Sequence, residues 1–453
     1  MPDAIATTLL ARRPVELLRQ LIQFNTTNPP GNEKDCIAFL HDVLTEADIT
    51  VKRYARSPTR PNLIARLPGR GAAPPLLLQG HIDVVTADHQ TWQHPPFGGD
   101  LVDGYVWGRG ALDMKSGVAM MVSALLRAKE DGVVPAGDVV LAVLSDEESG
   151  SDFGAKYLVE HHADLFAGVR YAIGEGGGTT LYMGKRRFYP IAIGEKQMCQ
   201  LRARVHGPAG HASGIARGGT MIRLSRFLQQ LNALRLPAHV TPAARLMLDA
   251  LVSTMPSPLN RLLHRLYDPA LVQTTLALLG PLAAPIEPMF RNTVNATIIR
   301  GGEKINVIPS EVTVDLDVRL LPGYGPADAI AEMRQVIGDD VDFEVLRFDT
   351  GPGEPDMGLF SALADILREA DPGSIPFPQM MPASSDARFF GRLGIQTYGF
   401  LPLKLPAGVD FMHLVHAADE RVPAEALTFG ADALYTLLQR FGAGAGASSQ
   451  SVH

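Results

Sequence analysis

Three stretches of the sequence place histidine or carboxylate side chains at the ends of apolar segments. The first segment covers residues 76–78, the second lies within 105–117, and the third covers 138–144. The polar residues are His81 and Asp83, then Asp113, then Asp146, Glu147 and Glu148. In an open α/β sheet the carboxyl ends of the strands form the ligand crevice, so one shared site is predicted. Imidazole and carboxylate without a thiolate suit a catalytic divalent metal such as zinc.

Each of these residues also has a simpler structural explanation. His81 and Asp83 alternate, so on an extended backbone they share a face, and Asp83 could orient the His81 ring. A strand-end histidine in an ordinary turn explains the tripeptide alone at least as well. Asp113 precedes a helical pattern, where an N-cap aspartate is common. The three contiguous carboxylates repel one another unless a cation or solvent neutralises them, which leaves a metal site and a solvated turn open.

Two further candidates and one rejected motif complete the polar residues. Glu175 precedes three glycines and could either bind a metal or end a strand in a flexible turn. His416 has His413 as a rival, and their spacing alone does not choose between them. Lys115 is preceded by methionine rather than the glycine that a phosphate loop requires, so a nucleotide site is rejected.

Composition limits the class of protein. The 453 residues exceed what one compact core usually supports, which predicts two domains. A net charge of −7 without a basic stripe gives no sign of nucleic acid binding. The only cysteines, Cys36 and Cys199, are expected to be buried thiols rather than a disulfide. Residues 1–23 lack the apolar run of a signal peptide, and no stretch is long enough to span a membrane, so a cytoplasmic protein is expected.

The order of the elements predicts an α/β fold with an inserted domain. Alternating strands and helices in residues 1–187 indicate a mostly parallel sheet. The α+β pattern of residues 188–350 indicates an inserted lid or dimerisation domain, interrupted by a leucine-rich helical insertion at 237–290. Residues 351–441 complete the first domain, and 442–453 form a low-complexity tail that is expected to be disordered.

Periodicity places the individual elements. The main predicted helices are 13–24, 33–47, 115–130, 154–161, 221–234 and 326–336, and the segments 359–369, 389–391 and 423–441 are expected to complete the first domain. The predicted strands are 62–67, 76–79, 138–144, 169–173, 189–193, 200–205, 293–299, 312–320 and 341–347.

Taken together and in this order, the motifs resemble one family of enzymes. The sequence is similar to the di-zinc peptidases and deacylases that include aminoacylase, glutamate carboxypeptidase, acetylornithine deacetylase and carboxypeptidase S, over about residues 14–440. The most specific stretches are 80–85, 107–115, 146–148, 175–177 and 306–309. The carboxypeptidase S and aminoacylase branch looks closest, through Pro95-Pro96-Phe97 and the Trp-Gly-Arg-Gly-Ala run at 107–111.

The resemblance implies a role for each polar residue. Asp113 would bridge two metal ions, zinc by default with Co²⁺ or Mn²⁺ as substitutes, and the peptide bond after it would be cis. The remaining ligands would be His81 and Glu175 for one ion, and Glu148 and His416 for the other. Glu147 would be the general base, and Asp83 would orient His81. His416 is preferred to His413 because family members place the ligand before a short spacer that ends in glutamate, here Glu420.

The inserted domain resembles the lid of the family. His211 would stabilise the oxyanion formed on the scissile carbonyl, and Asn295 and Arg319 would hold the carboxylate of the substrate. An exposed strand charge is the alternative for Arg319, because Asp315 and Asp317 precede it on the same face. The insertion at 237–290 departs from the simplest lids and leaves open whether the chain forms a homodimer through this domain.

These residues imply a hydrolase that releases an amino acid from an N-acyl amino acid or short peptide, by attack of a water molecule held between two zinc ions. The alternatives are a non-catalytic homologue that binds an amino acid derivative, or a dipeptidase or aminopeptidase. An aminopeptidase would require an acidic group for the free amine of the substrate, whereas Arg319 and Asn295 suit a carboxylate. The expected partner is therefore a small molecule, with neither nucleic acid nor membrane.

Overall fold

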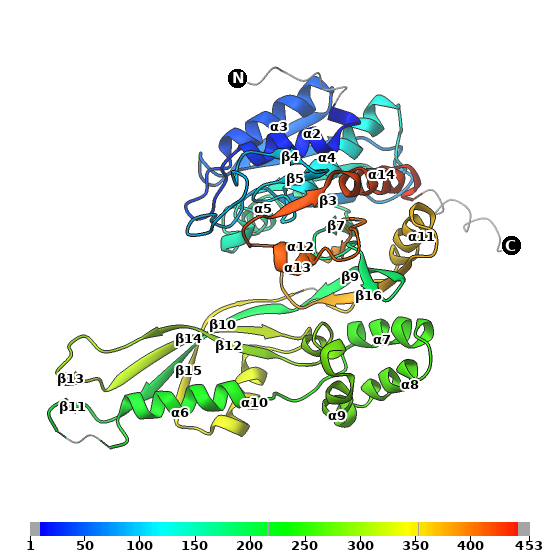
Figure 1. Ribbon diagram of the computed structural model, residues 1–453. Helices are drawn as coiled ribbons and strands as arrows, with labels where there is room; N and C mark the ends of the chain where they lie inside the picture. The colour runs from blue at the N-terminus through cyan, green and yellow to red at the C-terminus, as the bar shows by residue number, and fades with distance from the viewer. Residues whose placement is uncertain (1–9, 215–216, 352, 443–453) are drawn as a thin grey trace. The chain divides into compact units, whose positions relative to one another are not determined.

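The computed structural model describes residues 10–214, 217–351 and 353–442 (Figure 1). The chain forms two compact units: unit 1 comprises residues 1–193, 356–378 and 385–453, and unit 2 comprises 194–355 and 379–384. Unit 2 thus includes a short segment near residue 380 that the sequence assigned to the first domain. Residues 443–453, where a disordered tail was predicted, lie outside the described residues.

Unit 1 is organised around a nine-stranded sheet in the order β1-β2-β6-β3-β7-β17-β9-β16, with β8 paired to β9. Its central strands β6, β3, β7 and β17 run parallel, whereas β1, β2 and β9 are antiparallel to their neighbours, which confirms the predicted α/β class. The strands are β1 (Thr50–Ala55), β2 (Pro61–Leu67), β3 (Leu76–His81), β6 (Val139–Leu144), β7 (Tyr171–Gly174), β8 (Leu181–Met183), β9 (Arg186–Glu195), β16 (Ile375–Met381) and β17 (Gln396–Gly399).

Helices cover both faces of this sheet because its central strands are apolar on both faces. Every residue of β3 and β6 is buried. On one face, Leu77 and alternate residues of β6 form a core with the helices α5 and α12. On the other face, α4 packs against β3 and is itself covered by α2 and α14 (Figure 1). The helices are α2 (Pro14–Gln23), α3 (Lys34–Glu46), α4 (Lys115–Glu130), α5 (Ala155–His161), α11 (Phe360–Ala370), α12 (Ala387–Gly391), α13 (Phe411–Leu414) and α14 (Ala424–Arg440).

Unit 2 contains an antiparallel four-stranded sheet in the order β12-β14-β10-β15. Alternate residues of β10 and β14 are buried against the helices α6 and α10, so one face forms the core and the other carries charged side chains. The elements are β10 (Gln197–His206), α6 (Thr220–Ala233), β12 (Thr293–Arg300), β14 (Glu311–Leu320), α10 (Pro326–Ile337) and β15 (Val341–Asp349).

The leucine-rich segment of unit 2 is helical. It folds into α7 (Pro242–Thr254), α8 (Leu259–His264) and α9 (Pro269–Leu279), followed by short 3₁₀ turns. Within the described ranges, none of the helices is long and apolar enough to cross a membrane. Cys36 and Cys199 are both buried and free.

Candidate metal centre

Three neighbouring parallel strands of the central sheet end at the same edge. His81 is the last residue of β3, Glu147 and Glu148 follow β6 after a two-residue turn, and Glu175 directly follows β7. The strands are in close register, because Leu76 of β3 pairs with residues near the start of both β6 and β7. The three strand ends therefore present their polar side chains to one crevice, as the carboxyl edge of a parallel sheet does.

Asp113 reaches this crevice by a different route from the one the sequence predicted. The strand before it, β5 (Tyr105–Trp107), belongs to a separate three-stranded sheet, so Asp113 does not end a strand of the central sheet. It lies in the turn before α4, and the residue at the N-cap of that helix is Met114, with no side chain bonded to the helix end. The capping explanation for Asp113 is therefore wrong. The Asp113–Met114 peptide is cis, in agreement with the resemblance.

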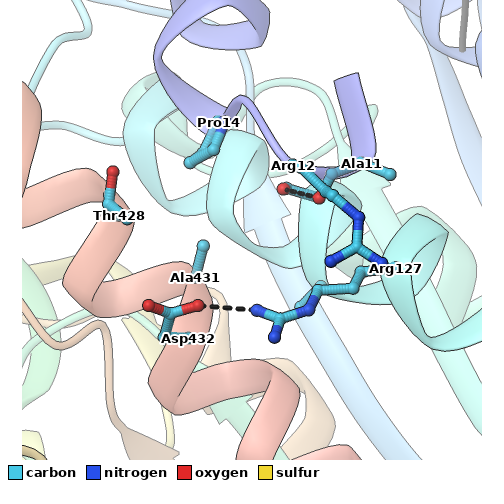
Figure 2. Close-up of a pocket in the computed structure, with 9 residues that line it drawn as sticks. Ala11, Arg12, Pro14, Arg127, Thr428, Ala431 and Asp432 are labelled. Atoms are coloured by element: carbon cyan, nitrogen blue, oxygen red, sulfur yellow. Dashed lines mark hydrogen bonds and ion pairs between the residues drawn. The ribbon is translucent and has the colours of Figure 1, made fainter. Parts of the chain in front are cut away.

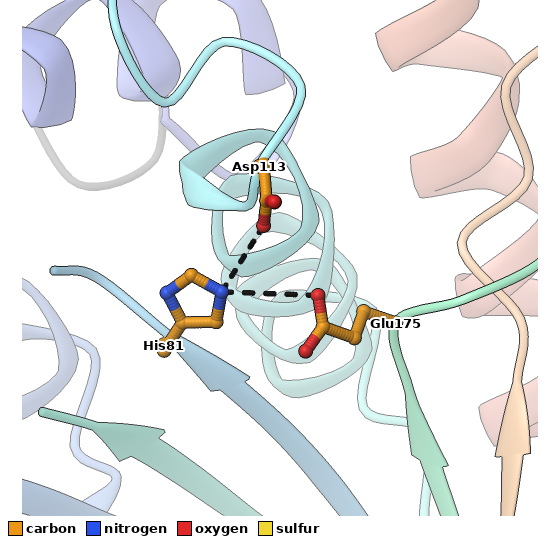
Figure 3. A group of neighbouring side chains, drawn as sticks. All are labelled: His81, Asp113 and Glu175. Carbon is orange, nitrogen blue, oxygen red and sulfur yellow. Dashed lines mark hydrogen bonds and ion pairs between the residues drawn. The ribbon is translucent and has the colours of Figure 1, made fainter. Parts of the chain in front are cut away.

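The carboxylate of Asp113 lies between two histidines. Its Oδ1 is 3.1 Å from His81 Nε2, and its Oδ2 is 3.2 Å from His416 Nε2. In the first cluster, His81 Nε2 is also 3.8 Å from a carboxylate oxygen of Glu175 (Figure 3). The ligand atoms of His81, Asp113 and Glu175 all lie within 4.8 Å of one another, a spacing that could hold one metal ion.

The second cluster shares Asp113 with the first. Glu148 Oε1 lies 3.3 Å from His416 Nε2, and the ligand atoms of Asp113, Glu148 and His416 again lie within 4.8 Å of one another. His413 lies on α13 with its side chain 86% exposed and its ring 2.6 Å from Asp410. The structure therefore brings His416, and not His413, to the carboxylates.

The carboxylate of Asp83 makes closer contacts with the turn that carries Glu147 and Glu148 than with the ring of His81. His81 Nδ1 lies 3.0 Å from the main-chain oxygen of Asp83 and 3.6 Å from its carboxylate. The Asp83 carboxylate accepts hydrogen bonds from the main-chain N–H groups of Glu147 and Glu148, each at 3.1 Å, and from Asn28 at 2.8 Å. With Nδ1 donating to a carbonyl oxygen, the Nε2 lone pair of His81 faces the cluster, which is the tautomer a metal ligand needs.

The charges of the cluster are not balanced by its own side chains. Burial raises the pKa of Glu147 and Glu148, and it raises the pKa of Glu175 to about 7. Hydrogen bonds to Asp113 and Glu148 raise the pKa of His416 to about 10. Glu148 Oε1 is buried, with the His416 ring 3.3 Å away as its ion-pair partner. This excess of largely buried negative charge, with nitrogen and oxygen donors only, fits a pair of divalent cations.

Comparison with known proteins identifies the family. The model described as peptidase family M20/M25/M40 matches residues 77–440. The chain belongs to this peptidase family. It is therefore a metal-dependent hydrolase, which favours catalysis over the non-catalytic alternative.

Three similar proteins illustrate the breadth of the M20 family. A succinyl-diaminopimelate desuccinylase from Paracoccus denitrificans is 28% identical over 444 residues, covering 94% of this chain and 98% of that protein. The human N-fatty-acyl-amino acid synthase/hydrolase PM20D1 is 27% identical over 377 residues, covering 81% of this chain and 74% of that protein. The metallo-carboxypeptidase Sso-CP2 from Sulfolobus solfataricus has the same fold, with a TM-score of 0.69, 16% identity, and 95% of this chain and 99% of that chain covered.

One charged residue beside the M20 cluster was missed from the sequence. Arg388 of α12 is 2% exposed, and its Nη1 lies 3.7 Å from a carboxylate oxygen of Glu147. Its guanidinium also donates to the main-chain oxygen of Ser385 at 2.6 Å and to Ser151 Oγ at 3.3 Å. Ser151 in turn donates to Asp386 at 2.5 Å. The signal in the sequence was a pair of opposite charges, at 386 and 388, directly before two phenylalanines.

The three predicted lid residues of this M20 hydrolase lie in unit 2. Asn295 of β12 and Arg319 of β14 share the charged face of the sheet, since Asn295 pairs with Asp317, two residues before Arg319. Arg319 forms a two-pronged ion pair with Asp317 at 2.7 and 3.0 Å and donates to Ser384 at 2.9 Å. His211 is exposed on the separate two-stranded sheet of β11 (Gly210–His211) and β13 (Val307–Ile308), with Nδ1 2.7 Å from Ser213 Oγ.

A surface pocket elsewhere on unit 1 is distinct from the cluster. It lies among residues of α2, α4 and α14 and of the segment before α2, and an ion pair of 2.6 Å between Arg127 and Asp432 spans it (Figure 2). None of its lining residues belongs to either His–carboxylate cluster. It therefore has no part in the site of this hydrolase.

Proposed function

We propose that this M20 hydrolase cleaves the amide bond of an N-acyl amino acid or a short peptide and releases an amino acid with a free carboxylate. The observation that carries the proposal is the pair of His–carboxylate clusters that share Asp113. A second carboxylate, Glu147, lies beside them, and its position is held through Asp83 and Arg388. This arrangement supplies both a place for two cations and a base for the attacking water.

We assign five residues as the metal ligands. His81 and Glu175 would hold one ion, Glu148 and His416 the other, and Asp113 both. Zinc suits this set of ligands best, with Co²⁺ or Mn²⁺ as substitutes. When bound, two such ions polarise the scissile carbonyl and make the attacking water more acidic.

Glu147 would carry the proton through the reaction. Burial, and next the neighbouring charge of Glu175, raise the pKa of Glu147, so it accepts a proton more readily than an exposed glutamate. It would take the proton of the attacking water and pass it to the leaving amine. The hydrogen bond from its main-chain N–H to Asp83 and the nearby guanidinium of Arg388 restrict where its carboxylate can lie.

The substrate class is proposed from the relatives and from the residues of unit 2. By their names, one relative acts on N-fatty-acyl amino acids and another removes the succinyl group of succinyl-diaminopimelate. Arg319, with Asn295 on the same sheet face, would bind the carboxylate of the substrate, because a guanidinium matches a carboxylate in a bidentate fashion. We assign His211 to stabilising the oxyanion, as the family resemblance implies.

Two further features belong to the same proposal. The exposed edge strand β12, with Ile298 and Ile299 on its surface, suits pairing with a second copy of the chain, which light scattering would test. The inserted unit 2 would then serve both as lid and as dimerisation domain. A cytoplasmic location is consistent with two buried free thiols.

The test is Glu147→Gln, assayed for amino acid release from a panel of N-acyl amino acids and dipeptides. The substitution keeps the size of the side chain and removes the base, so we expect kcat to fall by about 10²–10⁴-fold with the metal content unchanged. Glu160→Gln is the matched control, because Glu160 lies on α5 and pairs only loosely with Arg392 at 3.5 Å. Activity of Glu147→Gln near that of the control would remove the proposed base.

A further inference from the structure

His416 occupies an unusual position for a metal ligand. It lies in the loop between α13 and β18 (Arg421–Pro423), and its side chain is 47% exposed. Its backbone has a φ of +63°, a left-handed conformation that non-glycine residues adopt uncommonly. Neither burial nor regular secondary structure fixes this residue. Other groups must therefore hold its main chain in place.

Arg109 is the principal group that does so. Its side chain is 1% exposed, Nη2 donates to the main-chain oxygen of His416 at 3.3 Å, and Nη1 donates to that of Ala417 at 3.1 Å. Gln90 supports the same carbonyl: its Nε2 donates to His416 O at 3.1 Å while its Oε1 accepts from Arg109 at 2.8 Å. The left-handed residue thus has two donors on its oxygen, one of them a buried guanidinium.

Glu420 joins Arg109 to the other side of the site. Its carboxylate is fully buried and accepts from Arg109 Nη1 at 2.7 Å. It also accepts from the main-chain N–H groups of Gly110, Leu112 and Asp113, at 3.2, 2.7 and 3.2 Å. The Arg109–Glu420 pair therefore links the main chain that carries Asp113 to the main chain that carries His416.

Stability is a weak reason for such a pair. A buried ion pair usually contributes little net stability, because the desolvation of both charges offsets their attraction. The position of the Arg109–Glu420 pair is better explained by a role in fixing the main chains that carry Asp113 and His416. The hydrogen bonds of Glu420 reach the main chain of the residue shared by both clusters, whereas Arg109 itself donates to the main-chain oxygens of His416 and Ala417, and to that of Thr86 at 3.3 Å.

We propose that Arg109 is a positioning residue for one metal ion, the ion held by Asp113, Glu148 and His416. It acts through the main chain of His416, and Gln90 assists it. The ion held by His81, Asp113 and Glu175 depends less on Arg109, because β3 carries His81, Glu175 directly follows β7, and Arg109 reaches Asp113 only through Glu420. This inference rests on the proposed function only in requiring that both clusters bind a metal ion.

The experiment is a zinc titration of the full-length protein against a competing chelator, which resolves the two binding constants. In Arg109→Met we expect one constant to weaken by about 10- to 100-fold, as loss of an outer contact of a ligand does, and the other to change by less than about threefold. Arg109→Lys keeps the charge opposite Glu420 but loses the planar fork, so its effect should be smaller. Gln90→Leu, on an exposed loop, should shift the same constant by less again.

Two further variants test whether the weakening of zinc binding in Arg109→Met is confined to one ion and is specific to Arg109. In a His416→Ala background, which lacks a ligand of the ion held by Asp113, Glu148 and His416, Arg109→Met should change the affinity of the other ion by less than about threefold. Arg187→Met is the matched control, since Arg187 of β9 forms a two-pronged pair with the buried Asp371, at 2.7 and 2.9 Å, and belongs to neither cluster. It should leave both constants unchanged.

The outcomes separate this inference from the proposed function. Equal weakening of both ions in Arg109→Met and Gln90→Leu, or no weakening in either, would overturn the positioning role. A wild-type protein that binds two ions but hydrolyses no member of the panel would overturn the proposed function and leave the role of Arg109 standing. A wild-type protein that binds fewer than two ions would overturn both.

Discussion

Each of the two units contains a group of acidic side chains, and the two groups differ in whether basic side chains of the protein neutralise them. On the sheet face of unit 2, Asp315 lies 2.7 Å from Arg202 and 2.5 Å from Arg300, and Asp317 faces Arg319. Each of these carboxylates has a guanidinium partner. In the crevice of unit 1, the cationic partners of Glu148 and Glu175 within the described part of the chain are histidines, and the guanidinium of Arg388 lies 3.7 Å from Glu147.

The pKa values of Asp315 in unit 2 and Glu175 in unit 1 move in opposite directions. The Arg202 guanidinium, followed by that of Arg300, lowers the pKa of Asp315 to about 2, because both favour the charged carboxylate. Burial raises the pKa of Glu175 to about 7. The carboxylates of unit 2 are thus neutralised by the chain itself, whereas those of unit 1 need cations from solution. Acidic residues alone do not mark a metal site, whereas buried acidic residues without matching basic partners favour one.

The largest expected effect comes from removing the shared carboxylate of unit 1. Asp113→Ala takes one ligand from each cluster at once, so we expect the protein to lose both ions and all measurable hydrolysis. Elemental analysis after dialysis, with a rate assay, measures both losses. Asp317→Ala, which removes an acid of unit 2, should retain both ions. Retention of two ions by Asp113→Ala would show that the clusters are not the metal centre.

The next largest effect is expected in the pH dependence of the free energy of unfolding of the metal-free protein. The folded pKa of Glu175 is raised from 4.5 to about 7, so folding favours its protonated form. Its contribution to stability is fully present below pH 4.5 and is lost as the pH rises through 7. The free energy of unfolding of the chelator-treated protein should therefore fall over this range, and less steeply in Glu175→Gln. Equal slopes in urea titrations of the two proteins would contradict the unbalanced charge of the cluster.

Asp315 should show the opposite dependence. Its folded pKa lies below the ordinary 3.8, so its contribution to stability is present above pH 3.8 and is lost as the pH falls through about 2. Comparing Asp315→Asn with the wild type in acid unfolding measures this. A variant that lost stability equally at pH 2 and pH 6 would show that the carboxylate charge is not the cause.

The smallest effect is expected for the ion pairs of unit 2. Arg202 and Asp315 lie on the open face of the sheet, where solvent screens their attraction, so their coupling free energy should be no more than about 1 kcal/mol. A double-mutant cycle with Arg202→Ala and Asp315→Ala, followed by thermal unfolding, gives this value. Metal content should not change in any of the three variants.

The sequence predicted the elements that carry the site because they are apolar runs with clear periodicity. The central strands β3 and β6 and the helix α4 were all expected. Strands without that pattern were missed: β17 is four residues long and begins with Gln396 and Thr397, which are nevertheless buried. The strand β16 contains Pro376 and Pro378, which penalise a strand in the middle of a sheet, and it lies at the edge.

The part of the candidate site that lies at the ends of strands could be predicted from the sequence. His81, Glu147, Glu148 and Glu175 stand at the ends of recognisable strands, so their residue types and places in the chain were informative. Contacts through the main chain could not be predicted, because the spacing of residues along a sequence does not tell which main-chain N–H group donates a hydrogen bond to a given carboxylate. For that reason the hydrogen bonds of Asp83 to the turn after β6, and the approach of Arg388 from α12, appeared only in the structure.

The most direct test of the metal centre is anomalous X-ray scattering at the zinc edge from crystals of the zinc-loaded wild-type protein. We predict two peaks in the crevice of unit 1, one within bonding distance of His81, Asp113 and Glu175 and the other of Asp113, Glu148 and His416. A single peak, or peaks away from Asp113, would contradict the shared centre on which the proposed function depends.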